Sequence, residues 1–175
     1  MNHYYTNCLI NNSFLDYPNN EDQCISIYML GCDIGCMGCI NKSLADITIE
    51  NDNKITISVI KLIELLKIKS KNTKSNKICL LGGDPLFNKN IDFTRELLIS
   101  TNNLFDFCVY TGYDIDYVVK NDISGFKFIK TGKYIEELKQ ESLKTDDFIQ
   151  FASKNQHLYD SQFNLLSKEG KYYFN

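Results

Sequence analysis

The sequence predicts an α/β fold built on a mostly parallel sheet. Apolar, β-branched runs of strand length alternate along the chain with segments whose apolar residues recur at helical spacing. Each predicted strand ends at a glycine turn, and no repeat, low-complexity segment or linker divides the chain. Strands that alternate with helices pair in parallel through right-handed crossovers. We therefore expect residues 1–175 to form a single domain.

Four segments are predicted to be strands because they are rich in β-branched and aromatic residues and run into glycine turns. The predicted strands are residues 24–30, 77–85, 105–113 and 126–132. All the glycine turns follow the carboxyl ends of these strands. In parallel sheets that edge carries ligand sites, so the turns are the first place to look for function.

Four further segments are predicted to be helices. The predicted helices are residues 58–69, 91–100, 114–121 and 134–143. Thr56 or Ser58 can cap the first of them, because a hydroxyl before the first turn accepts a free backbone amide. Residues 147–175 show no clear periodicity, and no element is predicted there.

Composition excludes some classes of function. The net charge is about -3, which does not suit a nucleic-acid-binding protein. No signal peptide is visible, and no apolar run approaches the roughly 20 residues of a membrane span. We therefore expect a soluble cytoplasmic protein without membrane contact. Seven cysteines in a reducing compartment indicate metal or redox chemistry rather than disulfides.

Three cysteines, Cys32, Cys36 and Cys39, follow the first predicted strand within eight residues. Thiolates bind soft metals, and three in one tight loop suit a 4Fe–4S cluster whose fourth iron has no protein ligand. Glycines interleave with the thiols and let the backbone wrap closely around a cluster. A closed zinc site needs four ligands, so a zinc ion completed by a distant cysteine or histidine remains an alternative.

The other four cysteines lie far apart in apolar stretches. They are Cys8, Cys24, Cys79 and Cys108. Isolated cysteines in apolar segments behave as small core residues. No second closely spaced set exists that would hold an auxiliary cluster.

The pattern CxxxCxxC directly after a first strand resembles the signature of the radical SAM enzymes, which use S-adenosylmethionine. A second motif, LGGDPLF, resembles the Gly-Gly-Glu-Pro turn that follows the second strand in that superfamily. In this chain the turn is Gly82, Gly83, Asp84 and Pro85, with aspartate in place of the more usual glutamate. The resemblance implies that this turn holds the amino group of the methionine part of S-adenosylmethionine.

Within the superfamily, the chain is similar to the activating proteins of anaerobic (class III) ribonucleoside-triphosphate reductases. Four stretches carry this similarity, which runs from about Cys24 to Asp160. The stretches are GCDIGCMGCINKS (31–43), VYTGYDID (109–116), IKTGKYIEELK (129–139) and FASKNQHLYD (151–160). The chain departs from the family pattern at Lys130, Thr131, Phe151, Ala152 and His157.

The resemblance implies a shortened, incomplete radical SAM (β/α) barrel, open on one side to a large protein substrate. It implies a 4Fe–4S cluster on Cys32, Cys36 and Cys39 that cleaves S-adenosylmethionine reductively to a 5′-deoxyadenosyl radical. That radical generates a glycyl radical on the reductase, the expected partner. A flavodoxin or ferredoxin is the expected electron donor.

The implied cofactor-binding residues lie in three loops. They are Asn41, Gly82, Gly83, Asp84, Thr111 and Gly112, with Lys42, Tyr113, Asn155 and Gln156 as weaker candidates. No side chain is predicted to be a catalytic residue in its own right.

Two other interpretations remain open. The chain resembles other radical SAM enzymes in its cysteine spacing, which leaves an activase of the pyruvate formate-lyase type or a small-molecule enzyme possible. A non-enzymatic iron–sulfur carrier or zinc module is the alternative from a different class.

Overall fold

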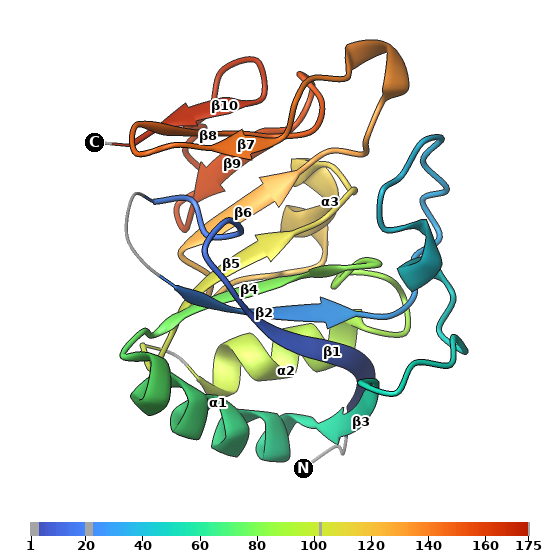
Figure 1. Cartoon of the computed structure of the whole chain (residues 1–175), viewed down its shortest axis with the longest axis vertical. Helices are drawn as coiled ribbons and strands as arrows, with labels where there is room; N and C mark the ends of the chain where they lie inside the picture. Colours follow the sequence, from blue (N-terminus) through green and yellow to red (C-terminus); the bar gives the residue numbers. More distant parts are fainter. Residues whose placement is uncertain (1–3, 20–22, 102, 175) are drawn as a thin grey trace.

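A seven-stranded sheet forms the centre of the protein, as the computed structural model in Figure 1 shows. The structure describes residues 4–19, 23–101 and 103–174. The strand order of the sheet is β3-β1-β2-β4-β5-β6-β9. Its two edge strands, β3 and β9, do not pair with each other, so the sheet is open rather than a closed barrel.

Four neighbouring strands in the middle of this sheet are parallel. They are β2 (Cys24–Met29), β4 (Lys77–Gly82), β5 (Asp106–Tyr110) and β6 (Phe128–Thr131). All four strands expected from the sequence are therefore confirmed. The predicted α/β class, an incomplete barrel with a parallel centre, is confirmed as well.

Antiparallel strands extend the parallel centre at both edges. These strands are β1 (Tyr5–Ser13), β3 (Ile55–Ser58) and β9 (His157–Asp160). None of them was predicted from the sequence. Their backbones cover the two outer strands of the parallel centre, β2 and β6.

Three helices cover one face of the sheet. They are α1 (Val59–Thr73), α2 (Ile91–Ser100) and α3 (Ile115–Lys120), close to three of the predicted helices. Ser58 caps α1 by accepting the Lys61 amide at 3.4 Å, and Asp114 caps α3 by accepting the Tyr117 amide at 2.8 Å. No helix in the described part of the chain has the length and apolarity needed to cross a membrane.

The two faces of the sheet receive alternate residues of each strand, because successive side chains point to opposite faces. Along β2, Ile25, Ile27 and Met29 pack against the helices. Cys24 and Tyr28 face the other way, toward a smaller apolar cluster that includes Tyr17. This second face, free of helices, is the one available for a ligand.

A second sheet of three short strands lies beyond β6 and β9, at the opposite end of the molecule from α1 in Figure 1. Its strands are β7 (Leu143–Lys144), β8 (Phe148–Gln150) and β10 (Lys171–Tyr173). Ile149 and Phe151 pack there with Leu158 of β9. The C-terminal segment thus closes over the upper part of the ligand-accessible face.

The helix predicted over residues 134–143 is wrong. Only a single 3-10 turn forms, η2 (Glu136–Leu138), and β7 follows it. The backbone of this segment pairs instead with the chain around Ser153: the Gln140 amide donates to Ala152 at 3.0 Å, and the Lys154 amide donates to Leu138 at 2.9 Å. Pairing with a distant segment overrides the local helical pattern.

Candidate functional site

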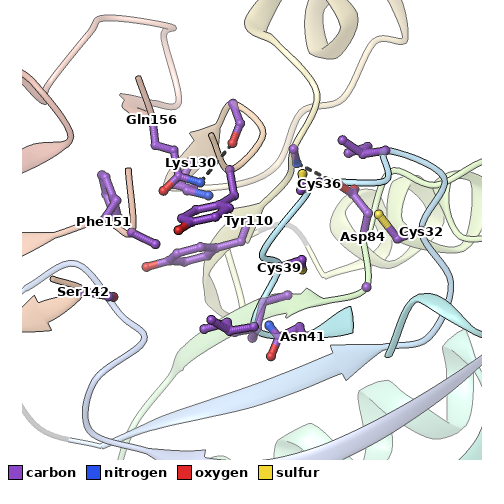
Figure 2. A pocket seen from close by; sticks show the side chains of 18 of the residues that line it. Cys32, Cys36, Cys39, Asn41, Asp84, Tyr110, Lys130, Ser142, Phe151 and Gln156 are labelled. Carbon is purple, nitrogen blue, oxygen red and sulfur yellow. Dashed lines mark hydrogen bonds between the residues drawn. The ribbon is translucent and has the colours of Figure 1, made fainter. Parts of the chain in front are cut away.

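A cavity of about 290 Å³ opens at the carboxyl edge of the parallel strands, on the face away from the helices. This volume is near the lower end of the roughly 300–1,000 Å³ typical of small-molecule sites. Its walls come from the cysteine loop, the ends of β4, β5 and β6, and the C-terminal segment. Figure 2 shows the side chains that point into it.

The cysteine loop places three half-buried thiols, Cys32, Cys36 and Cys39, on the wall of this cavity. The start of the loop is fixed by two backbone hydrogen bonds to the short 3-10 turn η1 (Lys42–Ala45). The Gly31 amide donates to Leu44 at 2.8 Å, and the Cys32 amide donates to Ala45 at 3.2 Å. The loop is thus held at both ends while its thiols face the cavity.

The Gly82–Gly83–Asp84 turn packs directly against the backbone of the cysteine loop. The Gly83 amide donates to Met29 at 2.7 Å, and the Asp84 amide donates to Gly31 at 2.8 Å. A Cβ atom on Gly83 would collide with the Gly31 carbonyl oxygen, so only glycine allows this approach. Among the described residues, no donor reaches the Gly83 carbonyl oxygen, and Gly83 lines the cavity. That oxygen is an available acceptor for a ligand ammonium group.

The Asp84 carboxylate ties the β4 turn to the β5 turn. It is buried, and it accepts the Leu86 amide at 2.8 Å, the Gly112 amide at 2.8 Å and the Thr111 hydroxyl at 2.9 Å. Burial raises the pKa of Asp84 to about 6, although these donors and the nearby Lys130 favour the charged form. The carboxylate therefore positions the Thr111–Gly112 turn at the rim of the cavity. Its direct contact with a cofactor stays a prediction.

Replacing Asp84 tests this positioning role. We expect Asp84→Ala to lower the free energy of unfolding by about 2–4 kcal/mol, because the buried Leu86 amide, the half-buried Gly112 amide and the Thr111 hydroxyl lose their acceptor. Thr111→Val removes only the hydroxyl and keeps both amides bonded, so a loss of about 1–2 kcal/mol is expected. Urea denaturation at pH 7 measures both. Equal losses in the two variants would contradict the positioning role.

Most residues predicted from the sequence to bind cluster or cofactor reach the cavity. Those that line it are Cys32, Cys36, Cys39, Asn41, Gly83, Asp84, Gly112 and Gln156. Gly82 and Thr111 lie behind the wall, the first inside β4 and the second bonded to Asp84. Tyr113 lies outside it and donates a 2.6 Å hydrogen bond to Asp33, which ties the β5 turn to the cysteine loop.

Several lining residues were not predicted as site residues. Tyr110, Lys130 and Phe151 form the part of the wall away from Cys32 and Asp84 in Figure 2. The signal for two of them is strand alternation: Tyr110 and Lys130 precede Gly112 and Gly132 by two residues and share their face. That alternation does not say which face is covered by helices, so their direction could not be predicted.

The donor set fits the 4Fe–4S cluster predicted from the cysteine spacing. Among the described residues that line the cavity there is no fourth thiol and no imidazole. A closed zinc site needs four such ligands. Three thiols from one loop on a shared cavity wall are the number that a 4Fe–4S cluster with one iron left without a protein ligand needs.

The remaining cysteines are fully buried core residues, as predicted. Three of them nevertheless meet in space on neighbouring strands. The Cys79 thiol lies 3.9 Å from the Cys24 sulfur, and Cys79 is paired with Cys108 across β4 and β5. Burial raises the pKa of Cys79, and hydrogen bonding to Cys79 together with burial raises that of Cys24. The Cys24 and Cys79 thiols therefore stay protonated in the core.

The chain was compared with known structures, curated proteins and protein families. QueE from Escherichia coli is similar in structure, with a TM-score of 0.42 and 20% sequence identity over 63% of this chain. The match covers 53% of QueE, about half of its length. No curated protein matches the chain. The family of 4Fe-4S single cluster domains matches residues 22–159, from the start of β2 through the cysteine loop to β9. Because this match covers most of the sequence, the chain belongs to the 4Fe-4S single cluster domain family.

Proposed function

We propose that this protein is a radical SAM enzyme, and in particular the glycyl-radical activating protein of an anaerobic ribonucleoside-triphosphate reductase. One observation carries the proposal. Three cysteine thiols and the Gly83–Asp84 turn, which the superfamily uses for cluster and S-adenosylmethionine, line the same cavity. Family membership supports the cluster, and the resemblance of the loop motifs supports the activase.

Each part of the cavity has a role in this proposal. Cys32, Cys36 and Cys39 would hold the cluster, and the Gly83 carbonyl would accept the amino group of the methionine part. Asp84 holds the Thr111–Gly112 turn in place beside it. When bound, the cluster and S-adenosylmethionine supply a 5′-deoxyadenosyl radical able to take hydrogen from a glycine Cα. Ile34 and Leu81 give the cavity wall apolar surface beside that position.

The specific activase assignment rests on loops outside the cluster ligands. Asn41, which lines the cavity, and Lys42 belong to the Asn-Lys-Ser stretch that resembles the reductase activases. Tyr113, in the matching Tyr-Thr-Gly-Tyr turn, is bonded to the cysteine loop through Asp33. The glycyl-radical subunit of the reductase is the proposed partner, with a flavodoxin or ferredoxin as electron donor.

An anaerobic assay tests both levels of the proposal. Reconstituted and reduced protein should convert S-adenosylmethionine to 5′-deoxyadenosine and methionine. Adding the candidate reductase should produce a glycyl radical signal in electron paramagnetic resonance. Cleavage without that signal would leave a radical SAM enzyme and reject the activase, whereas absence of cleavage would reject both.

One observation favours a second candidate, a radical SAM enzyme that acts on a small anionic molecule. The cavity is walled on one side by Ser142 and Phe151 of the C-terminal segment and contains the buried Lys130. A lysine ammonium can pair with the carboxylate of a small acid, whereas a glycine loop offers it no negative charge. Turnover that requires an added small carboxylic acid, and not the reductase, would favour this candidate.

A further inference from the structure

Lys130 lies on β6, the last of the four parallel strands, and its side chain lines the cavity. Only 9% of its surface is exposed. Its ammonium nitrogen lies over the Tyr110 ring, 5.6 Å from the centroid. Figure 2 shows it beside Tyr110, Phe151 and Gln156, on the side of the cavity away from Cys32. It replaces the apolar residue expected there from the resemblance to the activases.

No carboxylate in the described part of the chain lies within ion-pairing distance of this ammonium, and no acceptor there forms a hydrogen bond with it. Asp84 attracts it only from a longer range. The neighbouring Gln156 does not serve as a partner, because its oxygen accepts the Ser153 amide at 3.2 Å. A buried lysine without a counter-charge is costly, and such groups are normally paired. The ammonium therefore has an unused preference for an anion.

The charge of the cavity indicates what kind of anion fits. Lys130 is the single lysine or arginine among the described residues that line it, and Asp16 and Asp84 contribute negative charge. Phosphate sites normally gather several donors, such as a run of backbone amides or a bidentate arginine. One ammonium over the Tyr110 ring matches a group with one negative charge. Tyr110 and Phe151, with ring centroids 6.3 Å apart, offer apolar surface beside it.

We infer that Lys130 and the Tyr110–Phe151 wall form a binding site for the carboxylate group of a molecule held in the cavity. This inference builds on the proposed function, because two sources of the carboxylate follow from it. The first is the methionine part of S-adenosylmethionine. The second, under the small-molecule candidate, is the acid from which hydrogen is taken. Both present the same chemistry to the ammonium.

Binding experiments on the anaerobically reconstituted protein separate the two sources. S-adenosylhomocysteine carries the carboxylate, and 5′-methylthioadenosine has the same adenosyl group without it. Sodium benzoate, titrated into protein saturated with S-adenosylhomocysteine, represents a carboxylate from a second molecule. Calorimetry would compare wild type, Lys130→Met and the control Lys133→Met, whose lysine follows the same strand but is exposed.

Two outcomes support the site. If the methionine part is the source, Lys130→Met weakens S-adenosylhomocysteine binding about tenfold or more and leaves 5′-methylthioadenosine binding unchanged. If a second molecule is the source, Lys130→Met leaves both adenosyl compounds unchanged and weakens benzoate binding by a similar factor. Unchanged binding of all three probes, or an equal loss in Lys133→Met, would overturn the inference.

The stability of the variant gives an independent check. Removing an unpaired buried charge should leave Lys130→Met at least as resistant to urea as wild type. A lower urea midpoint of unfolding would mean that the ammonium already has a partner within the protein, and it would overturn the inference. Failure of the proposed function looks different, because wild type would then bind no adenosyl compound. The benzoate titration, repeated without an adenosyl compound, would still test Lys130.

Discussion

Cys36→Ala protein, reconstituted with iron and sulfide without oxygen, should release no 5′-deoxyadenosine from S-adenosylmethionine above background. Two thiols would remain on a cavity wall that has no other thiol or imidazole in the described residues. A cluster held by two ligands is lost or loses its open iron position, so iron content should fall too. Chromatography of the reaction and an iron assay measure the two effects.

Cys108→Ala is the matched control, because it makes the same substitution at a cysteine that lies outside the cavity. Cys108 is fully buried in β5, among Cys79, Cys24 and Tyr17. We expect wild-type iron content and cleavage, with the free energy of unfolding lowered by about 1 kcal/mol through the small cavity left behind. Equal loss of iron in both variants, or intact cleavage in both, would contradict the assignment of the cluster to the first loop.

The parallel centre of the sheet could be predicted because each of its strands is buried on both faces or nearly so. Such strands read as short apolar runs, as in KICLLG of β4. The antiparallel edges carry weaker signals: β1 contains Asn7, Asn11 and Asn12, and only two of its nine residues are buried. The C-terminal strands are only two to four residues long, and their pairing with distant segments is not a local property.

The residues of the site also divide into those that local sequence predicts and those that only tertiary packing sets. The cysteine ligands and the Gly82–Gly83–Asp84 turn could be found from sequence because their spacing is set by short-range backbone geometry. The bonds from Asp84 to Thr111 and Gly112 span 27 and 28 residues, so they depend on how two strands are placed side by side. The exposure of Lys130 to the cavity depends on which face of β6 the helices leave uncovered. Such facts follow from tertiary packing rather than from local pattern.

The close contact between the Gly83 turn and the cysteine loop leads to the second large effect. We expect Gly83→Ala to lower the free energy of unfolding by about 3 kcal/mol, because its new methyl group would collide with backbone oxygens of Gly31 and Leu44. Backbone cannot move aside as a flexible side chain can. The collision should push the β4 turn away from the cysteine loop, displace that loop and lower the iron content after reconstitution. Urea denaturation of the metal-free protein and an iron assay test the two parts separately.

Gly35→Ala separates crowding from backbone strain. Gly35 lies in the cysteine loop itself with φ +66°, but nothing lies within 4 Å of the position its Cβ would take. A non-glycine residue there should cost only about 1–2 kcal/mol of strain. If Gly35→Ala destabilised the protein as much as Gly83→Ala, loop conformation rather than contact with the β4 turn would control the site. A smaller loss, with iron binding preserved, would show that the turn after β4 supports the cluster loop through direct backbone contact.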